Sequence, residues 1–266
     1  MNTHYLALNV QYRTPPESHP GDVEFSSVPG KRHPTAPPRR PAAFTLIELL
    51  VVMGIIGILA GLVLTAVSKA KNQGAKITDV NNLKQIIICL HLYTTDNSER
   101  IPWPNWLNGD GPARQGWLYA LDTAAIGPAE FKAETGLYWP TLRDKRLYAC
   151  PMDHPEQHPE RDQQLSSYVM NGAVIGFDRT NYPPLKATQF HPDDVMYWET
   201  DETQPSYFND GASLPIEGVS KRHNQGAVCA ALGGVVRYIR FSDWYAMVNN
   251  ADRNNLWCYP DSSNGR

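Results

Sequence analysis

A single acidic side chain interrupts the longest apolar segment of this sequence. From Phe44 to Val67 the chain reads FTLIELLVVMGIIGILAGLVLTAV, and Glu48 is the only ionisable side chain in that run. An apolar run of about 20 residues can cross the hydrocarbon core of a bilayer as a helix. A charge there costs about 2.5–3.5 kcal/mol and so marks a functional position by default. We expect Glu48 to take a cationic partner from outside its own helix, which offers none.

Residues of metal-binding type gather in the segment PMDHPEQHPE. His154 and His158 lie four residues apart there, with Asp153 and Glu156 beside them. Three prolines prevent the helical geometry that would let both histidines reach one metal ion. We therefore interpret this segment as a solvated loop.

Two further sets of residues could carry chemistry. Glu199, Asp201 and Glu202 could bind calcium, although their spacing matches no known calcium loop. His223 could form a hydrolytic pair with a carboxylate, but a nucleophile motif such as G-x-S-x-G is missing. We expect no catalytic residue, no metal site and no cofactor, and hence no enzyme.

Cysteines and tryptophans leave alternatives open. An even number of cysteines in an oxidising compartment permits up to two disulfides in three connectivities, and the C-x-x-C spacing typical of zinc sites is missing. The tryptophans could form a carbohydrate- or peptide-binding surface, but tryptophan is more often part of a core or interface. The residues concerned are Cys89, Cys150, Cys229 and Cys258, and Trp103, Trp106, Trp117, Trp139, Trp198, Trp244 and Trp257.

A long helix must position Glu48. No proline falls between Pro41 and Pro102, so nothing breaks a helix in that interval. We predict one continuous helix from Leu46 to Thr95, whose first half lies in the membrane. Its second half is amphipathic, because apolar residues recur at spacings of three and four at Ile77, Val80, Leu83, Ile87 and Leu90.

The segment AFTLIELLVVMGIIGILA resembles the N-terminal signal of type IV prepilins and type II secretion pseudopilins. The resemblance implies that a prepilin peptidase cuts between Ala43 and Phe44 and then methylates the new amine of Phe44. It also implies that Glu48 pairs with the terminal amine of a neighbouring subunit during filament assembly. Ala43 stands where the family usually has glycine.

Two other interpretations of the apolar run are open. It could be an ordinary signal anchor with a stray acid, or a secretory signal cleaved at Ala66-Val67-Ser68. Against the second, the apolar part of a secretory signal runs about 7–15 residues and should not contain a glutamate.

Residues 1–43 precede the proposed cut and carry eight of the chain's 22 prolines, so we expect a disordered leader that is removed on maturation. This leader is long for the family, and translation could start near Val28 or Val23. Its basic residues favour a cytoplasmic leader, although Lys69, Lys71 and Lys76 on the other flank of the apolar run reduce that charge asymmetry.

Further segments resemble pseudopilin-like proteins of planctomycetes and verrucomicrobia. They are NNLKQIIICLHLYTTDNSERIP, YACPMD at 148–153 and SSYVMNG at 166–172. The same subfamily carries an H-x9-DG motif. His223 lies ten residues before Gly233, so Gly233 takes the place of the expected aspartate.

Short strands and one short helix are predicted beyond the long helix. The run GAVCAALGGVVRYIRF predicts an antiparallel hairpin, with strands near 226–232 and 235–241 and a two-residue turn in which Gly233 and Gly234 both have positive φ. Other strands are expected at Ser166–Met170, Ala173–Phe177 and Val195–Glu199, and a helix at Pro128–Glu134 capped by Gly136.

The predicted fold is therefore α+β and pilin-like, with a long N-terminal helix packed on a small antiparallel sheet in a loop-rich head. The expected parts are the leader 1–43, a transmembrane half 44–68, an amphipathic half 69–98 and a head 99–266. The resemblance implies a single-pass protein of a bacterial inner membrane with its C-terminal head in the periplasm.

The predicted function is that of a structural subunit of a type II secretion pseudopilus or related type IV pilus-like filament. Expected partners are the prepilin peptidase and methyltransferase, other pilin-like subunits in a homo- or hetero-filament, and the inner membrane. A net charge of −3 argues against nucleic-acid binding. The alternative is a membrane-anchored envelope protein whose head binds a ligand and never polymerises.

Overall fold

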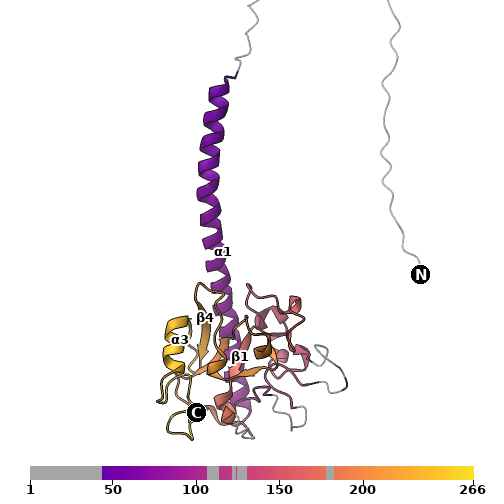
Figure 1. Ribbon diagram of the computed structural model, residues 1–266. Coiled ribbons are helices and arrows are strands. Elements are labelled where there is room, and N and C mark those ends of the chain that lie inside the picture. Colours follow the sequence, from indigo (N-terminus) through magenta and orange to yellow (C-terminus); the bar gives the residue numbers. More distant parts are fainter. Residues whose placement is uncertain (1–43, 107–113, 122–123, 125–130, 178–182) are drawn as a thin grey trace, which may run out of the picture. The chain divides into compact units, whose positions relative to one another are not determined.

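The computed structural model describes residues 44–106, 114–121, 124, 131–177 and 183–266 (Figure 1). The leader, including Ala43, lies outside the described residues, as does the start of the helix expected at Pro128–Glu134. The described end of that segment is a single 3₁₀ turn, Ala133–Thr135, and Gly136 follows it as the predicted cap. The φ of Gly136 is −73°, so this cap does not require glycine's left-handed freedom.

One helix dominates the N-terminal part of the chain. Helix α1 runs over Leu46–Asp96, 51 residues, and confirms the predicted Leu46 to Thr95 to within one residue. It ends where Ser98 and Glu99 adopt positive φ, a backbone conformation that stops a helix. The helix is long and apolar enough to cross a membrane.

The buried face of α1 begins later along the helix than predicted. Residues 46–74 are exposed, whereas from Asp79 onward one stripe of the helix is buried. Leu83, Ile87 and Leu90 lie in this stripe as predicted, and Val80 is half-buried. The prediction was wrong for Ile77, which is 54% exposed, because it lies off the stripe that the head covers, whereas Ala75 and Lys76 before it are already half-buried.

Five strands form one mixed sheet in the order β3-β1-β2-β4-β5. The pairs β1–β2, β2–β4 and β4–β5 are antiparallel, but β3 pairs with β1 in parallel, so the expectation of a purely antiparallel sheet was wrong. Parallel neighbours need a crossover connection, and here the chain forms β2 before it returns to the edge of β1. The strands are β1 Tyr168–Asn171, β2 Val195–Glu199, β3 Ala212–Ser213, β4 Gly226–Ala231 and β5 Val236–Arg240.

The predicted strand Val195–Glu199 is confirmed as β2, and the one expected at Ser166–Met170 begins two residues later as β1. The strand expected at Ala173–Phe177 was wrong, because Gly172–Ile175 forms a 3₁₀ turn. The Asn171 side chain accepts a hydrogen bond from the Ala173 N–H and caps this turn. A local side-chain cap thus outweighs the strand preference of the residues that follow.

The hairpin of β4 and β5 is confirmed, but its turn differs from the prediction. Only Gly234 has positive φ, +89°, and its N–H donates to the Ala231 carbonyl at 3.0 Å. The Ala231 N–H donates to the Val235 carbonyl at 2.8 Å, so the loop is longer than two residues. Gly233 is needed for space instead, since a Cβ there would lie 3.0 Å from Pro192.

The sheet separates two cores. One lies on the α1 side, where Leu83, Ile86 and Leu90 pack with Tyr197 and Val228. The other contains residues of helix α3, Phe241–Val248, packed with strand residues such as Val169, Trp198 and Cys229. Strands β1, β2 and β4 are therefore buried on both faces.

The tryptophans mostly belong to these cores. Trp117, Trp198, Trp244 and Trp257 are buried, and their indole N–H groups donate to backbone carbonyls. Partly buried Trp103, Trp106 and Trp139 pack against the α1-side core. This agrees with the interpretation of tryptophan as core in this domain.

Candidate functional site

The N-terminal site contains Phe44, Thr45 and Glu48. Phe44 is 72% exposed and lies two residues before α1, while Glu48 lies in the first turn of that helix. The Glu48 Oε2 atom accepts hydrogen bonds from the Thr45 N–H and the Thr45 hydroxyl, each at 2.8 Å. The Glu48 N–H donates to the Thr45 hydroxyl at 3.2 Å.

These reciprocal bonds form a capping box, in which the residue before the helix and the third helical residue satisfy each other's backbone N–H groups. Glu48 therefore has hydrogen-bond donors within its own chain, which the sequence analysis did not foresee. The signal was present as Thr45-x-x-Glu48 before an apolar run. Neither Ala43 nor the cut itself can be placed, since Ala43 lies outside the described residues.

A second site lies inside the head, where four side chains of metal-binding type meet. Asp79 comes from α1, Cys150 from the loop before β1, Glu199 from the end of β2 and His223 from the turn before β4. The first three are fully buried and His223 is 5% exposed. One ligand atom from each residue lies within 4.8 Å of the other three.

The His223 Nε2 atom lies at the centre of this cluster. It is 3.3 Å from Asp79 Oδ2, 3.4 Å from Glu199 Oε1 and 3.3 Å from Cys150 Sγ. The two carboxylate oxygens are buried and accept no hydrogen bond from the described residues. Three polar atoms thus converge on a nitrogen that carries at most one proton.

Backbone and side-chain donors hold the outer atoms of the cluster. The second oxygen of Glu199, Oε2, accepts a hydrogen bond from the Val228 N–H at 2.7 Å. Asp79 Oδ1 accepts one from the Tyr168 hydroxyl. The Met152 N–H donates to Cys150 Sγ at 3.4 Å. Each carboxylate is therefore held through one oxygen while its other oxygen faces His223.

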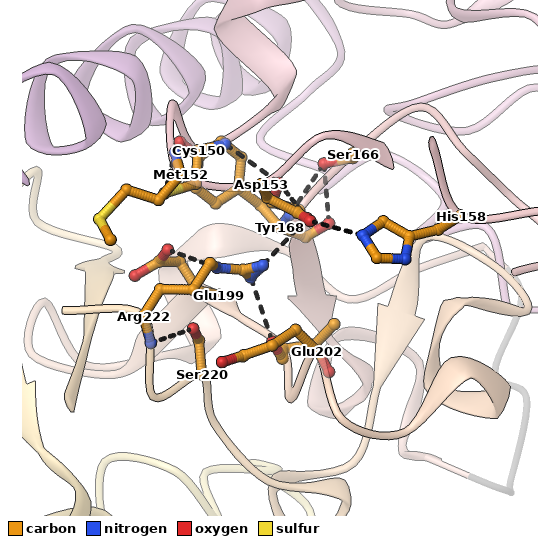
Figure 2. A network of polar contacts seen from close by, with 12 residues as sticks. Cys150, Met152, Asp153, His158, Ser166, Tyr168, Glu199, Glu202, Ser220 and Arg222 are labelled. Carbon is orange, nitrogen blue, oxygen red and sulfur yellow. Dashed lines mark hydrogen bonds and ion pairs between the residues drawn. The ribbon is translucent and has the colours of Figure 1, made fainter. Parts of the chain in front are cut away.

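Arg222 connects this cluster to a buried ion-pair network (Figure 2). Its Nε lies 3.5 Å from Glu199 Oε1, and its NH1 lies 2.9 Å from Asp153 Oδ2. Asp153 also accepts hydrogen bonds from Arg161, at 3.0 and 3.2 Å, and from the Ser167 hydroxyl, at 2.7 Å. Two buried guanidinium groups thus share one buried carboxylate.

The electrostatics of the cluster follow from burial and from the close approach of charges. Burial and the nearby Glu199 raise the pKa of Asp79 to about 7. Burial disfavours the imidazolium of His223, but contacts with Asp79 and Glu199 outweigh it and raise the pKa of His223 to about 9. Burial and both carboxylates raise the pKa of the Cys150 thiol, which is therefore protonated and inert as a nucleophile.

The structure does not bring the other predicted sets together. His154 pairs with Glu156 and His158 with Glu160; His158 Nε2 also lies 3.9 Å from Asp153 Oδ1, but Asp153 mainly pairs with the arginines. Among the calcium candidates, Asp201 accepts hydrogen bonds from Thr203, and Glu202 from the Lys221 N–H. Glu199 alone belongs to the buried cluster. The four cysteines, all in the described part of the chain, are buried free thiols.

Sequence reasoning singled out His223 and Glu199 separately but missed Asp79 and Cys150 as their neighbours. One signal for Asp79 was available, because it lies on the same helical stripe as Leu83 and Leu90. A charged residue on an apolar stripe indicates a buried partner. Cys150 lay in a segment already noted for its resemblance, but chain spacing gave no link to His223.

Comparison with known proteins bears on the N-terminal site. Comparison with curated proteins and with solved structures gave no match. Residues 38–64 match the prokaryotic N-terminal methylation motif. This motif implies processing by a prepilin peptidase and association with a membrane. The match supports a type IV prepilin-like protein.

Proposed function

We propose that this chain is a structural subunit of a type II secretion pseudopilus or a related type IV pilus-like filament. The observation that carries the proposal is the N-terminal methylation motif at residues 38–64, which covers Ala43, Phe44 and Glu48. Cleavage between Ala43 and Phe44 would leave an amine at Phe44, four residues before Glu48, whose N–H Thr45 caps. In such a filament this amine pairs with Glu48 of a neighbouring subunit.

The hydrogen bonds of Glu48 are compatible with that pairing. Both bonds from Thr45 reach the same oxygen, Oε2, so the capping box orients the carboxylate without using Oε1. The exposed apolar side chains along residues 46–67 supply the remaining contact surface, because helices of this kind bury such surface in lipid or against one another.

The proposed location is a bacterial inner membrane, crossed once, with the head in the periplasm. The partners are a prepilin peptidase and methyltransferase and other pilin-like subunits. We propose no catalytic role for the head, since its buried Cys150 thiol beside two carboxylates is a poor nucleophile.

One observation favours the alternative of a membrane-anchored protein that does not polymerise. The capping box gives Glu48 a use within its own helix, so the presence of this residue does not by itself require a neighbouring subunit. The two functions differ in what they need from Glu48. Assembly needs its charge, whereas capping needs only an acceptor, which glutamine also provides.

Three variants separate charge from capping. Glu48→Gln keeps an acceptor for the Thr45 N–H but removes the charge, Thr45→Val removes the hydroxyl but keeps the charge, and Glu48→Ala removes both. Each full-length variant is expressed with a prepilin peptidase, and membranes are treated with a crosslinker and analysed by gel electrophoresis. Membrane extraction serves as the control, since Glu48→Ala should insert at least as well as wild type once its desolvation cost is gone.

The proposal predicts that Glu48→Gln and Glu48→Ala lose the ladder of crosslinked subunits while Thr45→Val retains it. Ladders of equal length for wild type and Glu48→Gln would contradict a role for the charge in assembly. The anchor function would then be the better account of this chain.

A further inference from the structure

We propose that Asp79, Cys150, Glu199 and His223 form a structural metal site that binds one Zn²⁺ ion in the head. This inference does not depend on filament assembly. It rests on the convergence of four ligand atoms, on two buried carboxylate oxygens without hydrogen bonds, and on the donors that hold the opposite side of three of the ligands.

The distances match a tetrahedral zinc site. Zinc binds sulfur at about 2.3 Å and nitrogen or oxygen at about 2.0–2.2 Å, so two ligand atoms of a tetrahedron lie about 3.4–3.6 Å apart. The His223 Nε2 atom lies 3.3 Å from Asp79 Oδ2, 3.4 Å from Glu199 Oε1 and 3.3 Å from Cys150 Sγ. The other ligand atoms lie within 4.8 Å of one another, so the widest pair would close by at most about 1.3 Å to surround one ion.

A cation explains what a proton on His223 leaves unexplained. One Nε2–H group can donate one straight hydrogen bond, yet three acceptor atoms lie at nearly equal distances from it. The facing oxygens of Asp79 and Glu199 are fully buried and accept no hydrogen bond from the described residues. Leaving buried acceptors unsatisfied costs about 1–3 kcal/mol each, and more for charged groups, whereas a metal ion would satisfy both at once.

The surroundings are those of a ligand shell. Metal-binding carboxylates and thiolates in proteins are oriented by outer hydrogen bonds. Here the Val228 N–H holds Glu199, the Tyr168 hydroxyl holds Asp79, and the Met152 N–H donates to Cys150 Sγ. On Glu199 and Asp79 the donor binds one carboxylate oxygen and His223 faces the other, whereas the single Sγ of Cys150 contacts both the Met152 N–H and His223.

The charges also balance. A thiolate and two carboxylates carry three negative charges, and Zn²⁺ with the guanidinium of Arg222, which lies 3.5 Å from Glu199, carries three positive charges. Binding would release the thiol proton of Cys150 and any proton on His223 Nε2, because a metal ligand must be deprotonated. The buried cluster would then be neutral as a whole.

The ligand types select zinc over the hard cations. Calcium and magnesium prefer oxygen ligands throughout, whereas this cluster contains one sulfur and one nitrogen. Four protein ligands fill a tetrahedral shell, which is the pattern of a structural rather than a catalytic site. Because Asp79 lies on α1 and the other ligands lie on three separate segments of the head, the ion would fasten the buried end of α1 to the sheet.

The first test is metal content. Full-length protein is purified in detergent without chelators and analysed by inductively coupled plasma mass spectrometry. We expect about one zinc per chain, and loss of that zinc in Cys150→Ala. Cys229→Ala is the matched control, because Cys229 is also a buried free thiol but belongs to the α3-side core, and it should keep the zinc.

The second test covers the case in which Cys150→Ala fails to fold. Wild-type protein is stripped with a chelator, checked for folding by circular dichroism, and titrated with Co²⁺ and Zn²⁺. We expect a sulfur-to-cobalt charge-transfer band that zinc abolishes, and a melting temperature that rises when zinc is restored. Tyr168→Phe, which removes the donor behind Asp79, should weaken zinc affinity about 10- to 100-fold.

Two results would overturn the proposal. One is a folded wild-type protein that carries no zinc and shows neither the cobalt band nor a rise in melting temperature. The other is equal zinc content in wild type and a folded Cys150→Ala variant. In either case the four residues would form only a buried ion-pair cluster centred on His223.

Discussion

Two of the acidic side chains of helix α1, Glu48 and Asp79, have surroundings that differ sharply. Glu48 lies near its start, exposed, within an apolar run, and hydrogen-bonds only one turn back to Thr45. Asp79 lies where the helix enters the head, fully buried, and meets residues up to 144 positions away along the chain, such as His223. The first is surrounded by neighbours in sequence and the second by neighbours in space.

This difference decides how each acid can be recognised. A lone charge in an apolar run stands out in the sequence, and the methylation motif agrees with that signal. A charge among polar residues does not stand out, although its place on a buried stripe makes it more costly to leave unpaired. The exposed half of α1 should therefore tolerate changes that the buried half and its network do not.

The largest effect is expected in the buried network behind Glu199. Asp153→Asn removes the charge shared by Arg161 and Arg222, whose side chains are 0% and 6% exposed, and leaves Arg161 without its countercharge and Arg222 with Glu199 alone. We expect a loss of about 3–5 kcal/mol in the free energy of unfolding. Urea unfolding of the full chain in detergent, followed by tryptophan fluorescence, measures it, since all seven tryptophans lie in the head.

The control for this variant is Glu156→Gln, an exposed acid in the same loop, which should change the free energy by less than about 0.5 kcal/mol. Equal losses for the two variants would show that the network does not matter for stability.

The same carboxylate predicts an acid dependence. Burial alone would raise the pKa of Asp153, but Arg222, Arg161 and Ser167 outweigh it and lower the pKa. The stability that the charged Asp153 carboxylate adds to the folded state is therefore complete above the pKa of an unfolded aspartate, about 3.9. It is lost as the pH falls through the lower pKa of the folded state. The difference in melting temperature between wild type and Asp153→Asn should therefore narrow as the pH is lowered from about 6 to about 3, the window that these pKa values define. A constant difference over that range would contradict this account.

A pair of leucines on α1 tests the two halves of the helix directly. Leu83 is fully buried in the α1-side core, whereas Leu59 is 55% exposed. Leu83→Ala should cost about 2–5 kcal/mol in unfolding of the head, and Leu59→Ala should leave it unchanged within about 0.5 kcal/mol. The same urea titration compares them. A comparable loss for Leu59→Ala would mean that the exposed half also stabilises the head.

The smallest effect concerns the hairpin turn. Gly234 has a φ of +89°, and an alanine there should cost about 1–2 kcal/mol, because L-residues are disfavoured in the left-handed region. Replacing both Gly233 and Gly234 with valine should destabilise the head further, since a Cβ at Gly233 also meets Pro192. Gly74→Ala, at an exposed helical position with open space, is the control and should not destabilise. A melting temperature unchanged by Gly234→Ala would show that the turn relaxes freely.

The long helix could be predicted from sequence because its causes are local. An absence of proline, an apolar run and a three-and-four spacing set its limits to within one residue. Strand β2 was equally clear. The strand predicted at Ala173–Phe177 was wrong, because the Asn171 side chain caps a 3₁₀ turn there. The parallel edge strand β3 was missed because two residues carry too little pattern to be recognised.

The N-terminal site and the buried cluster also differ in how far the sequence predicts them. Phe44 and Glu48 could be proposed from the sequence because their signal lies within one segment, although the capping role of Thr45 was overlooked. The buried cluster could not be assembled, since its four ligands come from four segments with no short spacing between them. The missing C-x-x-C pattern argued against zinc only for ligands that lie close together along the chain.

The most direct test of the central claim is the mature N-terminus of the protein. Full-length protein extracted from membranes of cells that contain a prepilin peptidase is analysed by intact mass and by mass spectrometry of its N-terminal peptide. We expect a chain that begins at Phe44 with a methylated amine, since the methylation motif at residues 38–64 covers the proposed cut between Ala43 and Phe44. A mature chain that begins at Lys69, or one that keeps residues 1–43, would contradict it.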